Sequence, residues 1–293
     1  MKKRLLAAIL SVIMIMAFLP SLVMAYQSDY SSPTIYPQQS HPKVMFNAGH
    51  VQQIRDNLTA SQNAAAYQEF QRLINLSAKS ETFSTLNGYW DESYECMIEA
   101  LAFDYAINGN TQNGNYAIAR MKEYLQKVTA KNGTSESMSY RYYGAIIFHA
   151  AEVLDWCYPL ISSSDANTII GYCDTLIKRL EIYTKGDTNK INGQGGITSH
   201  GSENQLLRDI LALGIATYNT NSDAKFHRTD IYPLAMGRLQ DEYVPVRNYL
   251  YTSDTTHQGS EYGWYRFYWD LCAETLVERM RQNNTVTLST QMI

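Results

Sequence analysis

The sequence predicts an all-helical domain. Apolar residues recur at three- and four-residue spacing in nine successive segments, and no segment shows the sustained alternation typical of β-strands. Short polar stretches such as "AINGNTQNGN" separate neighbouring segments, which favours antiparallel helix pairs. The predicted helices cover residues 47–58, 61–78, 92–108, 113–129, 138–157, 165–183, 202–218, 224–246 and 261–281.

The number of helices favours a solenoid or a closed (α/α) toroid over a small bundle. No clear repeat period is visible, which argues against a tetratricopeptide-type array. Several boundaries carry their own signals: Pro159 ends one segment, and the polar cluster 162–165 can cap the next. A long Gly- and Asn-rich loop, residues 184–199, precedes the helix predicted from residue 202, and such loops commonly carry functional sites.

The N-terminus has the three parts of a secretory signal peptide. A basic run, "KKR", precedes the apolar residues 5–19, and "VMA" offers a cleavage point after Ala25. We therefore expect a signal peptide over residues 1–25, an extended polar leader over residues 26–40, and a periplasmic or secreted protein. An uncleaved membrane anchor is the alternative, but no other segment is long and apolar enough to span a bilayer, so we expect no stable membrane anchor.

Composition indicates a globular domain. The chain has 293 residues, of which 45% are apolar and 18% charged, with a net charge of -4, and no basic stripe suggests a nucleic-acid partner. The 23 tyrosines fit either a compositional habit or a surface that binds sugars. Cys96, Cys157, Cys173 and Cys272 lie in apolar helical segments without metal-ligand spacing, so we expect buried free thiols, no metal and no cofactor.

Two stretches carry candidate chemistry. "TSHGSENQLLRD" places His200 and Glu203 three residues apart, near one face of the first turn of a helix, although both could simply decorate a helix N-terminus. "HQGSEYGWYRFYWDLCAETL" begins at His257 and places Tyr262 and Tyr265 at the start of an aromatic helix. Most of its aromatic residues can equally be explained by core packing.

Together with "HPKVMFNAGHVQQIRDNL", these stretches resemble the heparinase II/III-like polysaccharide lyases, heparinase II most closely. "GYWDESYECMIEALAFDYAINGN" and "HAAEVLDWCYPLIS" are similar to toroid helices of that family, and the resemblance covers roughly residues 41–280. It implies an incomplete (α/α) toroid over residues 41–293. It also implies that the β-sandwich domains which follow in the family are absent from this chain, so that the toroid domain is truncated at its C-terminus.

The resemblance implies cleavage of uronate-containing polysaccharides by β-elimination, with heparin- and heparan-type glycosaminoglycans favoured. His200, Glu203 and Tyr262 match its catalytic motif positions, whereas Ser199 replaces an Asn common in related lyases and makes an alginate specificity less expected. A protonated Glu203 could share its proton with the substrate carboxylate. His200 or Tyr262 could take the C5 proton, and Tyr262 could protonate the leaving O4.

Four further residues are expected to bind the acidic polysaccharide. Arg141, in "SYRYYG", could pair with a carboxylate or sulfate, although it could also be an exposed arginine at a helix start. The others are Trp90, Tyr265 and His257.

An open toroid would leave aromatic surface uncovered, so we expect weak activity or none, and either self-association or a β-sandwich partner.

Two other functions stay open. An (α/α) toroid glycoside hydrolase needs two carboxylic acids across the scissile bond. Its candidates, none of which forms a convincing pair by spacing, are Asp91, Glu92, Asp104 and Glu261. A non-catalytic glycan-binding module would bind without turnover.

Overall fold

The computed structural model describes residues 30–81, 91–130, 139–180, 202–251 and 259–281. For residues 139–141, 202, 250–251 and 259–266 it describes the backbone only. These ranges are mostly helical and contain no strand beyond one isolated bridge between Tyr218 and Arg228, so the all-helical fold class is confirmed. No helix in the described part of the chain is long and apolar enough to cross a membrane.

An irregular N-terminal segment leads into short helices. Residues 30–47, which include the predicted leader as far as residue 40, contain no helix and are anchored in the domain. The backbone N–H groups of Lys43 and Val44 each donate to Asp155 Oδ2 at 2.8 Å, and His41 Nδ1 lies 2.6 Å from Asp155 Oδ1. The helices that follow are η1 (Ala48–His50), α2 (Val51–Leu58), η2 (Ser61–Asn63), α3 (Ala64–Ile74) and η3 (Ser77–Lys79).

Four long helices form the middle of the chain. They are α4 (Glu92–Asn108), α5 (Thr111–Ala130), α6 (Ser139–Trp156) and α7 (Ser163–Ile177). Asp91 caps α4 by accepting from the Tyr94 N–H at 3.0 Å, and Gly109, with φ of 75°, ends it. Because only two residues separate α4 from α5, the two helices run antiparallel. Helix α6 packs against both α4 and α7.

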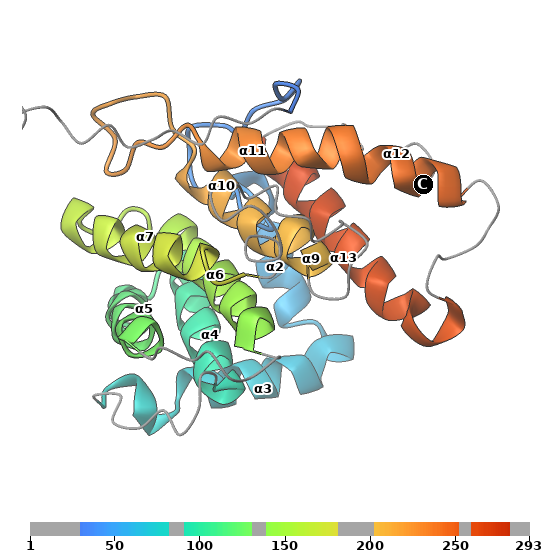
Figure 1. Cartoon of the computed structure of the whole chain (residues 1–293). Helices are drawn as coiled ribbons and strands as arrows, with labels where there is room; N and C mark the ends of the chain where they lie inside the picture. Colours follow the sequence, from blue (N-terminus) through green and yellow to red (C-terminus); the bar gives the residue numbers. More distant parts are fainter. Residues whose placement is uncertain (1–29, 82–90, 131–138, 181–201, 252–258, 282–293) are drawn as a thin grey trace, which may run out of the picture.

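Two long helical rods and a final helix complete the fold. The first rod joins α9 (Ser202–Asn204), η4 (Gln205–Ile210) and α10 (Leu211–Thr217). The second joins α11 (Ile231–Arg238), η5 (Leu239–Tyr243) and α12 (Val244–Tyr251), and it runs along the top of Figure 1. Helix α13 (Gly259–Arg279) packs against η4 and α10, and α10 packs against α6.

Most predicted helices were right, but several boundaries were wrong. The helix predicted over residues 61–78 is interrupted, since α3 ends at Ile74, and the helix predicted to end at residue 246 continues to Tyr251. The helix predicted from residue 224 begins at Ile231. Before it, Arg228 pairs with Asp230 at 2.6 Å and with Asp174 at 2.7 Å, and these ion pairs hold a turn where a helix was expected. The helix predicted to reach residue 183 ends at Ile177. All four cysteines have free thiols, as predicted, but only Cys157, Cys173 and Cys272 are buried, whereas Cys96 is half-buried.

Candidate functional site

Among the predicted catalytic residues, Glu203 is the one whose side chain lies within the described part of the chain. For Arg141 on α6, and for Tyr262 and Tyr265 on α13, the description is limited to the backbone. The other predicted residues lie outside the described residues: His200, Trp90 and His257. The helices themselves do meet, since α13 packs against η4, which directly follows Glu203 and Asn204.

Glu203 is fully buried and paired with Arg247. The guanidinium donates from Nη2 to Glu203 Oε1 and from Nε to the Tyr243 hydroxyl at 2.5 Å. The same Nε lies 3.3 Å from Asp270 Oδ1. None of these four side chains is more than 3% exposed. We call Glu203, Tyr243, Arg247 and Asp270 the Glu203 cluster.

The Glu203 cluster contains one more carboxylate than it has cations. Burial disfavours the charged form of Asp270, and the neighbouring Glu203 carboxylate adds repulsion, which together raise the pKa of Asp270 to about 8. Arg247 opposes this effect, but its charge is shared with Glu203. We therefore expect the cluster to hold one proton near neutral pH, on Asp270.

This geometry bears on the role expected of Glu203. Sharing a proton with a substrate requires a protonated carboxyl that a sugar can reach. The Glu203 side chain is 0% exposed and its Oε1 accepts from a guanidinium, so a sugar cannot reach the carboxyl in this arrangement. The arrangement instead favours a positioning role, in which Glu203 fixes the start of the first rod to α12.

Each of the two rods that the Glu203 cluster connects contains a π-helical segment. Segment η4 begins two residues after Glu203, and η5 ends at Tyr243, four residues before Arg247. Pro245 accounts for part of this, because it has no N–H to donate to the carbonyl of Asp241. Wider turns of this kind are rare and are found frequently at functional sites.

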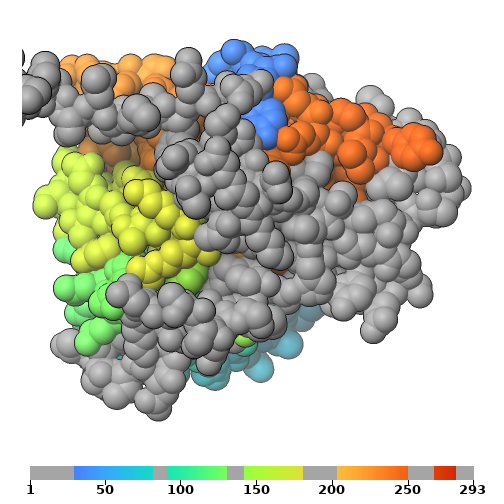
Figure 2. All heavy atoms as spheres, viewed as in Figure 1, coloured from blue at the N-terminus to red at the C-terminus, as the bar shows by residue number. Residues whose placement is uncertain are grey.

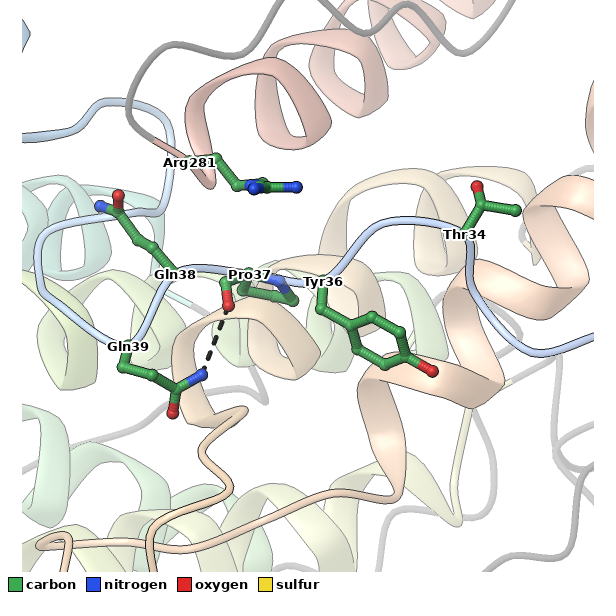
Figure 3. Close-up of a pocket in the computed structure, with 6 residues that line it drawn as sticks. All are labelled: Thr34, Tyr36, Pro37, Gln38, Gln39 and Arg281. Carbon is green, nitrogen blue, oxygen red and sulfur yellow. Dashed lines mark hydrogen bonds between the residues drawn. The ribbon is translucent and has the colours of Figure 1, made fainter.

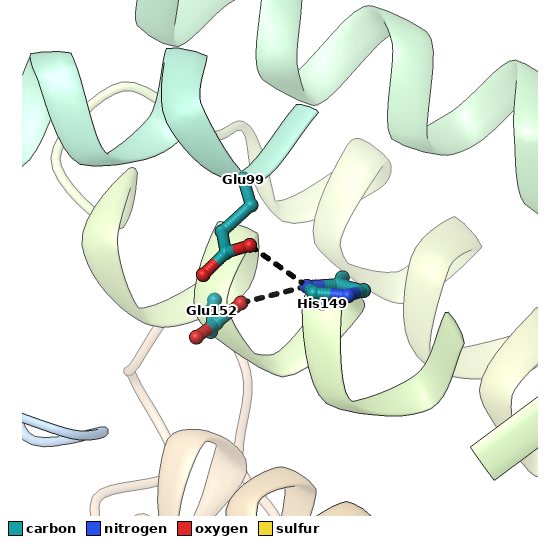
Figure 4. Close-up of side chains that lie close together, drawn as sticks. All are labelled: Glu99, His149 and Glu152. Carbon is teal, nitrogen blue, oxygen red and sulfur yellow. Dashed lines mark hydrogen bonds and ion pairs between the residues drawn. The ribbon is translucent and has the colours of Figure 1, made fainter. Parts of the chain in front are cut away.

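A second polar group surrounds His149 on α6. His149 Nδ1 lies 3.0 Å from Glu152 Oε2 and 3.8 Å from Glu99 Oε2, and Figure 4 shows both carboxylates directed at the ring. On the other side of the ring, Nε2 lies 3.8 Å from Glu95 Oε2. We call Glu95, Glu99, His149 and Glu152 the His149 cluster.

The carboxyls of the His149 cluster are crowded. Although 39% of the Glu99 side chain is exposed, desolvation of its carboxyl and repulsion by Glu152 raise the pKa of Glu99 to about 7. Glu152 is 1% exposed, and burial raises its pKa well above the ordinary value. The cluster therefore carries one carboxyl, Glu99, whose protonation changes near neutral pH, and a second, Glu152, in which burial favours the neutral form.

Arg208 lies between the two clusters. Its guanidinium stacks over Phe148 at 4.8 Å and over Trp269 at 4.6 Å, and its Nε lies 2.6 Å from Asp209 Oδ1. Trp269 precedes Asp270 of the Glu203 cluster, and Phe148 precedes His149. The adjoining part of α13 exposes three large apolar side chains, Phe267, Tyr268 and Leu271. Cationic, acidic and aromatic groups thus meet where α6, η4 and α13 pack.

Sequence reasoning missed both clusters apart from Glu203. Arg247 lies 44 positions from Glu203, and no local spacing connects them. The His149 cluster does have a signal in the sequence. "HAAE" places His149 and Glu152 three residues apart, and Glu95 and Glu99 are four residues apart on the helix predicted over residues 92–108. These pairs match the spacing of helical metal sites, but only the packing of α4 on α6 joins them.

A surface recess lies away from both clusters. It has a volume of about 370 Å³ and is lined by residues 34 and 36–39 of the leader and by Arg281 (Figure 3). Gln39 Nε2 donates to the Pro37 carbonyl at 3.4 Å within it. Among the described residues that line it, the ionisable side chains are Arg281 and Tyr36, and none is a carboxyl or an imidazole.

The acids considered for a hydrolase do not form a pair where they are described. Asp91 caps α4, and Glu92 is exposed. Asp104 is 4% exposed and accepts from Asn108 and Asn113 at 2.8 and 2.7 Å. The side chain of Glu261 lies outside the described residues.

No protein-family model matches the sequence, and no curated protein is significantly similar to it.

Proposed function

We propose that this chain is an exported polysaccharide lyase module that cleaves uronate-containing polysaccharides by β-elimination, with heparin- and heparan-type glycosaminoglycans favoured. The single observation that carries the proposal is the buried pairing of Glu203 with Arg247 at the start of the first rod. This pairing holds the helix that follows His200 in a fixed orientation, next to the helix that carries Tyr262.

The spacing along α13 supports the same arrangement. Asp270 of the Glu203 cluster and Tyr262 lie eight residues apart on α13, which corresponds to about 12 Å along a helix axis. Arg247 lies beside both Glu203 and Asp270, so one guanidinium fixes the first rod, α12 and α13 relative to one another. A catalytic pair on two different elements requires such rigid support.

In this mechanism the reacting groups are His200 and Tyr262. A uronate C5 proton becomes removable only when the adjacent carboxylate is neutralised, because the intermediate places further negative charge beside it. His200 takes the C5 proton, and Tyr262 donates a proton to the leaving O4 as the C4–O4 bond breaks. The electron pair of the C5–H bond forms the C4–C5 double bond. Glu203 acts as a positioning residue, and Arg141 is the proposed cation for the substrate carboxylate.

The test is turnover by the purified chain on heparin, heparan, chondroitin and alginate. A lyase produces an unsaturated uronate that absorbs in the ultraviolet. Because weak activity is expected of the open toroid, we expect this absorbance to grow slowly with time. Tyr262→Phe should remove it while leaving helix content unchanged, because only the proton carrier is lost. Tyr249→Phe, at a 79% exposed tyrosine of α12, is the matched control and should keep wild-type turnover.

The alternatives give different results in the same assay. New reducing ends without ultraviolet absorbance would replace the lyase with a hydrolase. Saturable binding of a polysaccharide without any turnover would identify a glycan-binding module. Equal turnover by Tyr262→Phe and the wild type would contradict the role of Tyr262.

A further inference from the structure

The His149 cluster places three metal-ligating side chains around one point. One carboxylate oxygen each from Glu99 and Glu152 and one imidazole nitrogen of His149 all lie within 4.8 Å of one another. His149 Nδ1 lies 3.0 Å from Glu152 Oε2 and 3.8 Å from Glu99 Oε2. A tetrahedral ion with bonds of about 2.1 Å separates its ligands by about 3.4 Å, so the two measured separations bracket the value that an ion requires.

The opposite side of the imidazole provides an independent observation. Metal-bound histidines usually direct their second ring nitrogen at a carboxylate, which fixes the tautomer and the ring orientation. His149 Nε2 faces Glu95 Oε2 at 3.8 Å, while the other Glu95 oxygen accepts from the Tyr124 hydroxyl at 2.7 Å. Glu95 is therefore held in the position of an outer partner, and Nδ1 is left to face the two remaining carboxylates.

The balance of charge also favours a cation. Among the described side chains, four carboxyls lie around the imidazole of His149 and the guanidinium of Arg208: Glu95, Glu99, Glu152 and Asp209. The guanidinium, Arg208, already has Asp209 as an ionic partner at 2.6 Å. Among these side chains the carboxyls outnumber the cationic groups. Burial disfavours the ionised carboxylates, and a bound cation stabilises that ionised form.

An ion can reach this point from solvent. Glu99 is 39% exposed in its side chain and His149 is 14% exposed, whereas Glu152 lies beneath them at 2%. Three protein ligands with an open side leave room for a water molecule as the fourth ligand.

We propose that Glu99, His149 and Glu152 bind one divalent transition-metal ion and that zinc is the preferred ion. An imidazole nitrogen among two carboxylates suits zinc better than magnesium or calcium, which prefer sets of oxygen ligands only. The ion joins α4 to α6, since Glu99 comes from the first helix and the other two ligands from the second. This inference does not depend on the lyase proposal.

The experiment is a calorimetric titration of the full, untagged chain with zinc chloride, after treatment with a chelator and dialysis. We expect one ion per chain and a rise in the melting temperature of about 5 °C at saturating zinc. Glu99→Gln, at the most exposed ligand, should weaken binding about 10-fold or more. Glu92→Gln, at an exposed acid of the same helix, is the matched control and should bind as the wild type does.

Two further measurements keep the test independent of folding. Cobalt(II) should give the visible absorption of a low-symmetry site containing nitrogen, and His149→Gln should remove that spectrum. Glu95→Gln should weaken zinc about 10-fold without changing the stoichiometry, because Glu95 orients the ring and does not bind the ion. Binding by Glu99→Gln with wild-type affinity, or the absence of saturable binding by the wild type, would overturn the proposal.

Discussion

The raised pKa of Asp270 makes the stability of the folded protein depend on pH. Its carboxyl keeps a proton up to about pH 8 in the folded protein, whereas an unfolded Asp releases it near pH 4. Between these values the folded state binds one proton more than the unfolded state. The free energy of unfolding therefore falls as the pH rises, and this contribution is fully lost once the pH passes about 8.

The first stability prediction concerns Asp270→Asn. Asn stays neutral and cannot lose a proton, so the variant lacks this pH-dependent loss. We expect it to be more stable than the wild type at pH 8, with a difference that grows by up to about 1.4 kcal/mol per pH unit between pH 5 and pH 8. Urea unfolding followed by circular dichroism at four pH values measures it. The exposed Asp223→Asn is the control, and parallel pH curves for wild type and Asp270→Asn would contradict the assignment.

At the same scale, the sequence predicted one member of the Glu203 cluster. Glu203 was found because it follows a histidine by three residues at a helix start. Arg247 and Asp270 could not be found in this way, because they lie on other helices and only packing brings them to Glu203. The burial of Glu203 is likewise a tertiary property, and it changes the expected role of the residue from proton donor to positioning residue.

Among the elements, α10 and α11 approach each other most closely at a glycine. A Cβ on Gly214 would lie 2.8 Å from the Tyr232 Cα and 3.0 Å from the Tyr232 nitrogen. These are backbone atoms, so a change of side-chain rotamer cannot relieve the clash. The contact therefore requires glycine at this position of the helix.

We expect Gly214→Ala to destabilise the protein by about 1–3 kcal/mol, through the shift it forces on α11. Gly171→Ala on α7 is the matched control. A Cβ there meets nothing within 4 Å, and we expect it to stabilise the helix by up to about 1 kcal/mol. Thermal unfolding of both variants compares the two effects. If Gly214→Ala melts at or above the temperature of Gly171→Ala, the two helices do not pack as described.

Element boundaries were predictable where the signal is local. Helix α4 was predicted over residues 92–108 and occupies those residues, because Asp91 and Gly109 form its caps within the sequence itself. The start of α11 was not predictable, because Arg228 is held by Asp174, which belongs to another helix. The π-helical segments leave no trace in apolar spacing over so few residues.

Across the whole molecule, the leader was predicted as an extended segment, but its anchoring was not. Lys43 is 0% exposed, and its Nζ donates to the carbonyls of Gln38 at 3.0 Å and Tyr218 at 2.9 Å. The leader also reaches the second rod, where the Tyr30 hydroxyl donates to Glu242 and the Ser31 N–H donates to Asp241, both at 2.6 Å. Figure 2 shows the N-terminal part of the described chain, in blue, lying against that rod, in orange.

The last stability prediction concerns the anchor of the leader. Asp155→Ala removes the acceptor of two buried N–H groups and of His41, and an unsatisfied buried donor costs about 1–3 kcal/mol. We expect a loss of at least ~3 kcal/mol in urea unfolding. Asp56→Ala, at an exposed acid of α2, should change stability by less than about 0.5 kcal/mol. A loss for Asp155→Ala as small as that of the control would show that the leader is not anchored there.

A contact between Asn47 and the last helix affects the order in which the chain can fold. Asn47 Nδ2 donates to the Arg279 and Arg281 carbonyls, so residues at the start of the domain bond to residues 232 and 234 positions later. A ribosome adds about 5–20 residues per second, so these bonds must wait for roughly ten seconds to most of a minute after Asn47 is made. Until then the early helices exist without their closing contacts. These two bonds of Asn47 therefore form only after α13 has been made, and a nascent chain lacking α13 holds its N-terminal segment through its other contacts alone.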